Sequence, residues 1–328
     1  MMTSISKKMA SVILSLCCMA FLSLTIFSTD AYPQQKVFPE KAISIIAATP
    51  GSLGDLWIRS WGDEFAKLLK VPYVVENKGG AMSQLVQLSM AKPDGHTISY
   101  FSYPSMIAWD MAAKPPVDLF NDFSPLGAFG TYSALIAVEA SSPFKTFEDL
   151  IDYAKKNPKK LKCGTPGQHL HDHFIFELLM EHTKTDMVTV PFTGSSQVVT
   201  ALLGKHVDLI VLAPAALVGH MKAGRIRPLI TVQKLKEFPD VPLFSQKGLG
   251  DAGIVSPTGL IALSTTPKEA QNKLIDAFAK VAKDPKNIES IEKLGFTGEY
   301  WSPTEMWAKM KKDNEKIDPI VDRLGIKK

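Results

Sequence analysis

The chain has 328 residues, of which 45% are hydrophobic and 21% charged, so it is long enough to bury the cores of two globular domains. Its formal net charge of +4 is small and its lysines are spread along the sequence. These properties argue against a basic nucleic-acid-binding stripe and against an acidic tail.

The first 31 residues have the pattern of a secretory signal peptide. Lys7 and Lys8 precede an apolar run that ends near Phe27, and Thr29 and Ala31 suit the cleavage site that follows it. We therefore expect residues 1–31 to be a signal peptide, cleaved before residue 32, and the mature chain to be exported.

Two alternatives to cleavage remain open. The apolar run approaches transmembrane length, so it could stay as an uncleaved anchor. Cys17 and Cys18 raise a lipoprotein alternative, although Leu16 stands where a small residue is expected before a lipidated cysteine. The mature chain keeps only Cys163, so we expect no internal disulfide and a fold held by its core.

The mature chain begins with a strand that turns tightly into a helix. Residues 42–48 form an unbroken apolar run, which predicts a strand buried on both faces. After the turn TPGS at 49–52, a helical pattern places four large side chains on one face: Trp57, Trp61, Phe65 and Leu68. The free backbone N–H groups at such a helix start suit an anionic ligand.

Strand and helix patterns then alternate to the C-terminus. Further strands are expected at 73–76, 97–101, 132–138, 161–164, 187–190, 207–212, 228–232 and 260–263. One helix is expected to begin at the GGAMSQL stretch, and another to run from the capping box at 146–149 to about residue 157. Further helices are expected through 174–179 and at 197–203, 215–223, 268–283, 288–294 and 303–324. The alternation predicts an α/β fold with two parallel-rich sheets flanked by helices.

Two sheets require the chain to pass between them. Composition breaks near 132–138 and near 256–261 suggest two chain crossings. We therefore expect one domain from residues 32–135 plus 256–328, a second from 136–255, and a ligand cleft between them that opens and closes.

A series of motifs in this order resembles the substrate-binding proteins of tripartite tricarboxylate transporters, the TctC/Bug family. The matching pieces are FPEKAISIIAATPGSLGD, VVENKGGA, KPDGHTISY, NDFSPLG, PGQHLHDHFIFELL, VPFTGSSQVVTALLGKHVDLI, MKAGRIRPL and FPDVPLF. The resemblance covers essentially the whole mature chain. It implies a type II-like two-domain periplasmic binding protein that is not an enzyme, captures a small organic carboxylate without a cofactor, and delivers it to membrane permease subunits. We expect a monomer.

The sequence departs from the family where ligand contact is expected. Ser52 replaces the second of two glycines after Pro50, and Met82 and Ser83 stand in a stretch that is usually glycine-rich. The loop from Thr165 to residue 169 and the segment 256–259 also differ from the family pattern. With Met82 and Pro166 in place of smaller residues, we expect a carboxylate that is less polar than a tricarboxylate, or differently shaped.

The expected recognition uses no cation. The four arginines, Arg59, Arg225, Arg227 and Arg323, lie outside the ligand loops, so backbone N–H groups, hydroxyls and water would hold the carboxylate. The predicted ligand-binding residues stand at strand ends and helix starts. They are Thr49, Gly51, Ser52, Leu53, Met82, Ser83, Ser102, Ser105, Thr165, Gly167, Gln168, Phe192, Thr193 and Ser195.

Several residues allow a second interpretation. Asp55 could accept from a ligand amine, but it stands four residues before Arg59, where a structural pair is favoured. Tyr103 could line an apolar wall together with Met82 and Phe192, or could belong to the core. His169, His171 and His173 suggest zinc, yet their spacing at a loop-to-helix junction does not converge three nitrogens, and we expect no metal.

Other functions receive less support from the sequence. No G-x-S-x-G motif is present, Cys163 lies in a predicted strand without a base, and the stretch after Pro50 lacks the lysine of a P-loop. The main alternative is a periplasmic sensor of the same fold that docks on a membrane receptor or sensor kinase. A metal-dependent hydrolase built on the histidines is the third hypothesis.

Overall fold

The structure is a computed structural model that describes residues 37–47, 49–78, 81–103, 117–168 and 170–325, apart from the side chains of 81 and 82. The predicted signal peptide, Ser105 and His169 lie outside these residues, as does the side chain of Met82. Lys41–Lys328 forms one unit of the chain, and the elements described below belong to it.

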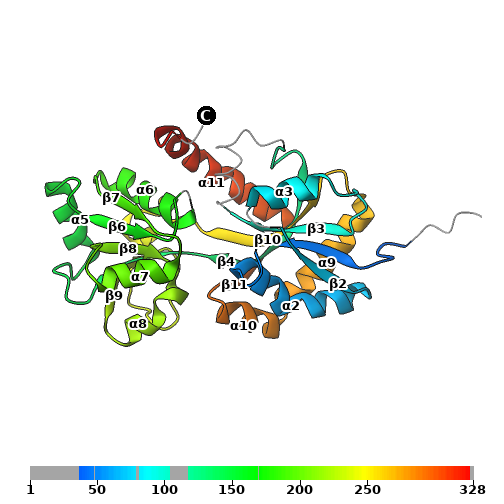
Figure 1. The fold of residues 1–328 in the computed structure, drawn as a ribbon, viewed down its shortest axis with the longest axis horizontal. Helices are drawn as coiled ribbons and strands as arrows, with labels where there is room; N and C mark the ends of the chain where they lie inside the picture. Colours follow the sequence, from blue (N-terminus) through cyan, green and yellow to red (C-terminus); the bar gives the residue numbers. More distant parts are fainter. Residues whose placement is uncertain (1–36, 48, 79–80, 104–116, 169, 326–328) are drawn as a thin grey trace, which may run out of the picture. The chain divides into compact units, whose positions relative to one another are not determined.

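The strands in this part of the chain form two sheets (Figure 1). Sheet A has the order β11 (Thr297–Trp301), β4 (Phe123–Tyr132), β10 (Ser256–Leu263), β3 (Thr97–Ser102), β1 (Ile43–Ala47) and β2 (Tyr73–Asn77). Sheet B has the order β7 (Val188–Pro191), β6 (Lys162–Thr165), β8 (Leu209–Leu212), β5 (Leu135–Glu139) and β9 (Ile226–Thr231).

Helices connect and cover these strands. They are α2 (Leu53–Leu69), α3 (Ala81–Ser89), α5 (Phe147–Lys156), α6 (His171–Thr183), α7 (Ser195–Leu203), α8 (Val218–Lys222), α9 (Lys268–Lys283), α10 (Pro285–Lys293) and α11 (Pro303–Arg323), with 3-10 turns at η1 (Pro214–Ala216) and η2 (Phe244–Lys247). The predicted α/β class is confirmed. The capping box at Thr146 is also present, because its hydroxyl accepts from the Asp149 N–H and the Asp149 carboxylate accepts from the Thr146 N–H.

The expectation of parallel-rich sheets needs correction, because both sheets are mixed. In sheet A, β1 pairs in parallel with β2 and β3, and in sheet B, β6 pairs in parallel with β7 and β8. The strands next to the crossings, β4, β5 and β10, make antiparallel pairs instead. Strand–helix–strand units produce the parallel pairs, whereas a strand that enters from another sheet can run in either direction.

Several strands, most of them next to the crossings, differ from the sequence prediction. The segment 132–138, expected as one strand, holds the end of β4 and the start of β5, which belong to different sheets. β10 begins at Ser256 and not at residue 260, although it contains Pro257 and Gly259. β11 was not predicted at all.

The pairing of β4 with β10 requires a glycine at 259. The register of the pair shifts between Pro257 and Gly259, and a Cβ at position 259 would stand 2.2 Å from the Gly127 carbonyl oxygen. That contact is with backbone, so no side chain could move aside to relieve it. The two crossing strands therefore approach one another at a distance that only glycine permits.

We expect Gly259→Ala to destabilise the protein by about 1–3 kcal/mol, at the upper end of that range, because it overpacks a fixed backbone contact. Urea unfolding measures the change. Gly219→Ala is the control, since a Cβ there meets nothing within 4 Å and alanine favours the helix by up to about 1 kcal/mol. Equal stability of Gly259→Ala and the wild type would show that the two strands can separate without loss, contrary to the constraint inferred here.

Helix α2 is fixed to sheet A by an aromatic cluster. Trp57, Trp61 and Phe65 are fully buried and pack around Phe278 of α9, mostly with edge-to-face geometry. The Trp57 Nε1–H donates to the Phe129 carbonyl at 2.8 Å. The expected fourth member, Leu68, is 37% exposed, and the neighbouring Leu69 turns inward instead.

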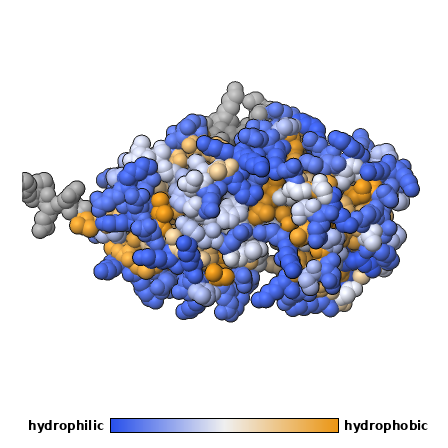
Figure 2. Space-filling model, turned by 180° about the vertical axis from the view of Figure 1, so that it is seen from behind, coloured by the Kyte–Doolittle hydropathy of each residue, from blue (hydrophilic) through white to orange (hydrophobic). Residues whose placement is uncertain are grey.

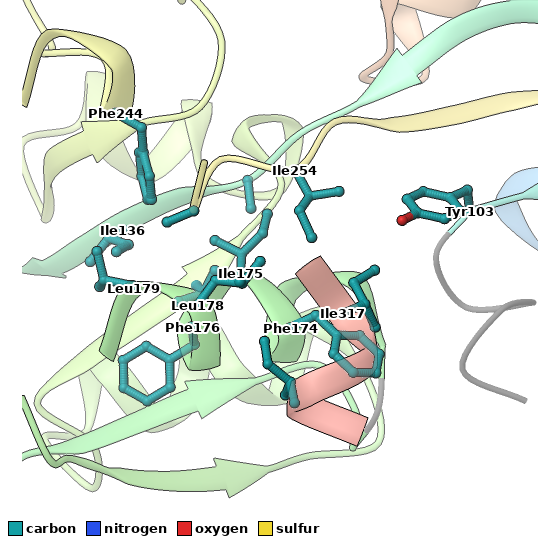
Figure 3. Close-up of a cluster of buried hydrophobic side chains, with 14 of the residues drawn as sticks. Tyr103, Ile136, Phe174, Ile175, Phe176, Leu178, Leu179, Phe244, Ile254 and Ile317 are labelled. Atoms are coloured by element: carbon teal, nitrogen blue, oxygen red, sulfur yellow. The ribbon is translucent and has the colours of Figure 1, made fainter. Parts of the chain in front are cut away.

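Helix α6 is apolar around most of its circumference. Phe174, Ile175, Phe176, Leu178 and Leu179 are all buried, and Figure 3 shows them in one cluster that also contains Ile317 of α11. α11 packs against both β4 and α6. A helix held on all sides presents its first turn in a fixed position.

Arg323, the last residue of α11, joins α11 and α6 by charge. It contacts Glu177 at 3.0 Å and Glu181 at 3.2 Å. Burial alone would raise the pKa of Glu177, but His173 and Arg323 hold the pKa of this carboxyl below its ordinary value. The side chain is therefore ionised at neutral pH and ties the C-terminal helix to α6.

The face shown in Figure 2 carries hydrophilic residues along most of its rim, with hydrophobic residues in separate patches. Small, separate apolar patches of this kind are normal on a globular surface. Within the described residues, no helix combines the length and apolar composition needed to cross a bilayer.

Candidate functional site

One cavity of about 430 Å³ collects residues from several helix starts and strand ends of both sheets. It is lined by Ser52, Leu53, Gly54, Gln84, Tyr100, Ser102, Tyr132, Pro166, Leu170, His171, Asp172, Ser195, Ser256, Thr258 and Phe296. Its volume suits a small molecule.

Hydroxyl groups dominate the polar lining of this cavity. They belong to Ser52, Tyr100, Ser102, Tyr132, Ser195, Ser256 and Thr258. Neither lysine nor arginine is among the described residues that line it. The cavity therefore offers many hydrogen-bond donors and no permanent positive charge.

The start of α2 enters this cavity through Ser52, its N-cap. The Ser52 Oγ accepts from the Asp55 N–H at 3.3 Å, which still allows the hydroxyl proton to be donated into the cavity. The backbone N–H groups of Leu53 and Gly54 lie in the first helical turn, where no intrahelical acceptor exists. The Gly51 N–H is engaged elsewhere, because it donates to Asp55 Oδ2 at 3.0 Å.

Asp55 has the structural role that the sequence favoured. Its carboxylate is buried and accepts from Arg59 Nε at 3.1 and 3.2 Å, and from Asn77 Nδ2 at 3.0 Å. Burial tends to raise the pKa of Asp55, but the bonds from Arg59, Asn77 and the Gly51 N–H outweigh it and hold the pKa below 3.8. This acid in the first turn of α2 is thus already neutralised by Arg59.

The start of α7 has no such acid. Its N-cap is Gly194, which offers no capping side chain, and its first turn contains no acidic residue. Ser195, the first helical residue, lines the cavity. Of the helix starts at α2, α6 and α7, the last is the one whose partial positive charge meets no first-turn carboxylate.

The start of α6 brings an acid into the cavity. Leu170 is the N-cap and makes no side-chain capping bond, and His171 and Asp172 follow it. Asp172 is only 2% exposed, and its Oδ2 accepts from the Tyr132 hydroxyl at 3.3 Å. His171 Nε2 lies 3.0 Å from the Ile254 carbonyl oxygen.

The two phenols of the cavity stay protonated at neutral pH. Burial raises the pKa of Tyr100, and the nearby side chains of Ser102 and Thr258 offset only part of this rise. Burial, followed by the charge of Asp172, raises the pKa of Tyr132 well above its ordinary value of 10.0. Both residues can therefore serve as neutral hydrogen-bond donors.

The structure places the predicted site residues in three groups. Four line the cavity: Ser52, Leu53, Ser102 and Ser195. Met82 and Ser105 cannot be placed, because the described residues exclude Ser105 and the Met82 side chain. The others are not part of the lining: Thr49, Gly51, Ser83, Thr165, Gly167, Gln168, Phe192 and Thr193. Ligand contact by any of them stays a prediction.

Several residues of the third group have other contacts. The Thr193 N–H and hydroxyl both donate to Gln197 Oε1, and the Thr165 hydroxyl donates to the Gly167 carbonyl oxygen. Phe192 packs against the apolar cluster beside sheet B. Tyr103, considered for an apolar wall, is fully buried in the core.

Most of the cavity wall was not predicted from the sequence. Tyr100 could have been found, because it stands two residues before Ser102 on a strand and so shares its face. The crossing strands, whose positions depend on long-range pairing, place three further lining residues: Tyr132, Ser256 and Thr258. Asp172 was seen only as part of the histidine stretch.

The histidines make separate contacts. His173 Nε2 lies 3.4 Å from Glu177 Oε1, whereas His171 bonds the Ile254 carbonyl. Over the residues that the structure describes, no group of three potential metal ligands is found.

The fold is that of two-domain periplasmic binding proteins: a solved structure described as a periplasmic transporter is 30% identical, covers 88% of this chain and 99% of its own, and has a TM-score of 0.72. The family model "Tripartite tricarboxylate transporter family receptor" (TctC) matches residues 58–326. The chain therefore belongs to the TctC family, and the resemblance inferred from its motifs is confirmed.

Two further relatives are informative. The "UPF0065 protein in gbd 5'region" of Cupriavidus necator is 32% identical over 315 residues, 94% of this chain and 95% of that protein. The solved structure of MatC from Rhodopseudomonas palustris with bound malate is 22% identical, covers 87% of this chain and 100% of its own, and has a TM-score of 0.69. At that identity the second likeness shows the fold alone.

We expect Asp55→Asn to lower the free energy of unfolding by about 1–3 kcal/mol at pH 7, because Arg59 and the Gly51 N–H lose a charged acceptor. The folded-state pKa of Asp55 is lowered, so its contribution is present above pH 3.8 and is lost as the pH falls through the folded-state value. The difference from the wild type should therefore shrink below about pH 4, as measured by urea unfolding between pH 3 and 7.

Glu64→Gln is the control for this experiment. Glu64 pairs with Lys67 on the same helix, but both side chains are exposed, so the change should cost less than about 1 kcal/mol. A pH-independent difference between wild type and Asp55→Asn would contradict the proposed ion-pair role.

Proposed function

We propose that this protein captures a small organic carboxylate in the cavity and delivers it to the membrane permease subunits of a tripartite tricarboxylate transporter. The observation that carries the proposal is the start of α7, where an uncompensated helix terminus and Ser195 meet a hydroxyl-lined cavity. A carboxylate there would accept from Ser195 and from first-turn N–H groups, which favour an anion by dipole and by hydrogen bonding.

The absence of a cationic side chain among the described lining residues fits reversible capture. An ionised carboxylate takes strong charge-assisted hydrogen bonds from neutral donors, and the cavity supplies seven side-chain hydroxyls. Malate, bound by MatC, is a small carboxylate of the size that such a cavity accepts. The protein would bind such a ligand and release it unchanged, without a cofactor.

Two domains that close on the ligand are part of this proposal. We place their bounds at residues 32–135 plus 256–328 and at 136–255, with the crossings as hinges. The β4–β5 crossing and the segment before β10 support this division, because the strands on either side belong to different sheets. Export by residues 1–31, a periplasmic location and a monomeric state complete the proposal.

A thermal-shift screen of the mature protein tests the carboxylate proposal. Malate, succinate, butyrate and benzoate would be compared with butylamine and glucose at equal concentration. A carboxylate at 100 times its Kd should stabilise the protein by about 2.7 kcal/mol and raise the melting temperature. A rise with the amine or the sugar and with none of the acids would overturn the proposal.

The role of Ser195 can be tested with the best acid from this screen. Ser195→Ala should weaken binding about 10- to 100-fold, because a hydrogen bond to a charged group contributes about 1.5–3 kcal/mol. Calorimetric titration measures the Kd. Ser196→Ala is the matched control, since Ser196 is on the same turn and does not line the cavity. Equal losses in both variants would argue against a carboxylate at this helix start.

A further inference from the structure

Among the described residues, Asp172 and His171 each have a buried side-chain atom in the cavity without a hydrogen-bond partner. Asp172 is 2% exposed and His171 is 4% exposed, and both line the cavity. Within the described part of the chain, neither Asp172 Oδ1 nor His171 Nδ1 has a hydrogen-bond partner. Unsatisfied buried polar atoms are uncommon in native proteins, so a pair of them inside a ligand cavity points to the ligand.

The contacts of the His171 ring define what its Nδ1 can do. Nε2 lies 3.0 Å from the Ile254 carbonyl oxygen, which can only accept, so Nε2 carries the proton. In the neutral ring, Nδ1 is then an acceptor. It lies 3.7 Å from Asp172 Oδ1, a separation too long for a hydrogen bond between the two side chains.

Asp172 is half satisfied. Its Oδ2 accepts from the Tyr132 hydroxyl, and it lies in the first turn of α6. Its charge nevertheless lacks a lysine or arginine partner, since none is found among the described cavity residues. Burying a carboxylate without a cationic partner costs free energy. Asp55 avoids this cost because it pairs with Arg59.

We infer that Asp172 and His171 form a subsite for a protonated amine of the ligand, so that the solute is an amino-bearing carboxylate. An ammonium group has three donors and a positive charge, and it can bond Asp172 Oδ1 and His171 Nδ1 together. A hydroxyl has one donor and would leave one of the two atoms unsatisfied. This inference rests on the proposed capture of a carboxylate and adds a second charged group to it.

The positions of the two subsites limit the size of the ligand. α6 follows β6 and α7 follows β7, and these strands are neighbours in sheet B. Neighbouring strands lie about 4.8 Å apart, so the amine at α6 and the carboxylate at α7 would be separated by only a few carbon atoms.

The test uses calorimetric titration and thermal shift of the wild-type mature protein with ligands matched in carbon chain. Butyrate carries the acid alone, butylamine the amine alone, and 2-, 3- and 4-aminobutyrate carry both groups, with the corresponding hydroxybutyrates as uncharged donors. We expect at least one aminobutyrate to bind about 30-fold or more tightly than butyrate and than its hydroxy analogue, a factor typical of a buried charge pair at about 2 kcal/mol.

Asp172→Asn should remove this preference, so that the variant binds the aminobutyrate no more tightly than it binds butyrate. Asp313→Asn is the matched control, because Asp313 is as buried as Asp172 but pairs with Lys309 and Lys316 on α11. It should change stability and leave the amine preference intact. Asp172→Ser serves as a second variant in case the asparagine variant does not fold, as judged by circular dichroism.

The outcomes separate the two proposals. Equal binding of butyrate and all aminobutyrates, or a preference that survives Asp172→Asn, overturns the amine subsite and leaves carboxylate capture standing. If butylamine binds as tightly as the aminobutyrates, and Asp172→Asn abolishes butylamine binding, the result supports the amine subsite and overturns carboxylate capture. Failure of every acid and amine to bind the wild type overturns both.

Discussion

The antiparallel pairing of β4 with β10 is the constraint on which the cavity depends. These strands lie next to the crossings, and the glycine contact between Gly259 and Gly127 sets how closely they approach. Tyr132 ends β4, and Ser256 and Thr258 begin β10, so the same pairing carries three cavity hydroxyls into position. Strand β3 supplies Tyr100 and Ser102 and the helix starts supply Ser52 and Ser195, so the cavity needs the crossing strands beside them to be complete.

The starts of α2, α6 and α7 differ in whether the first turn contains an acidic residue and in how that acid is paired. At α2 the first-turn acid is neutralised by Arg59, at α6 the Asp172 carboxylate accepts from the Tyr132 phenol, and at α7 the first turn contains no acid. In the proposed arrangement the cavity has one end that favours an anion and one that favours a cation, although neither lysine nor arginine is found among its described lining residues. Such polarity would orient a zwitterionic solute and would disfavour a dianion, whose second carboxylate would face Asp172.

The sequence predicted those features that depend on local patterns. Apolar runs located most of the strands, and capping residues and amphipathic spacing located most of the helices within a few residues. The mistakes occur where long-range pairing decides: β10 contains Pro257 and Gly259, which argue against a strand locally but suit an irregular pair with β4. Leu68 and Leu69 fit the helical stripe almost equally well, and only packing against the sheet selects Leu69.

The same difference between local patterns and long-range pairing explains which residues of the candidate site could be predicted. Ser52 and Ser195 could be predicted, because a helix start after a strand is visible in the sequence, whereas Tyr132 and Phe296 enter the cavity from distant segments. Asp172 shows the limit most clearly. Its sequence position suggests an ordinary first-turn acid. Its proposed role in ligand binding depends on its burial and on the Tyr132 hydroxyl at the first crossing. It also depends on His171, which bonds the Ile254 carbonyl just before the second crossing. Because both crossing segments contact this pair of residues, a ligand that satisfies them would also interact with the segments about which the two domains are proposed to close.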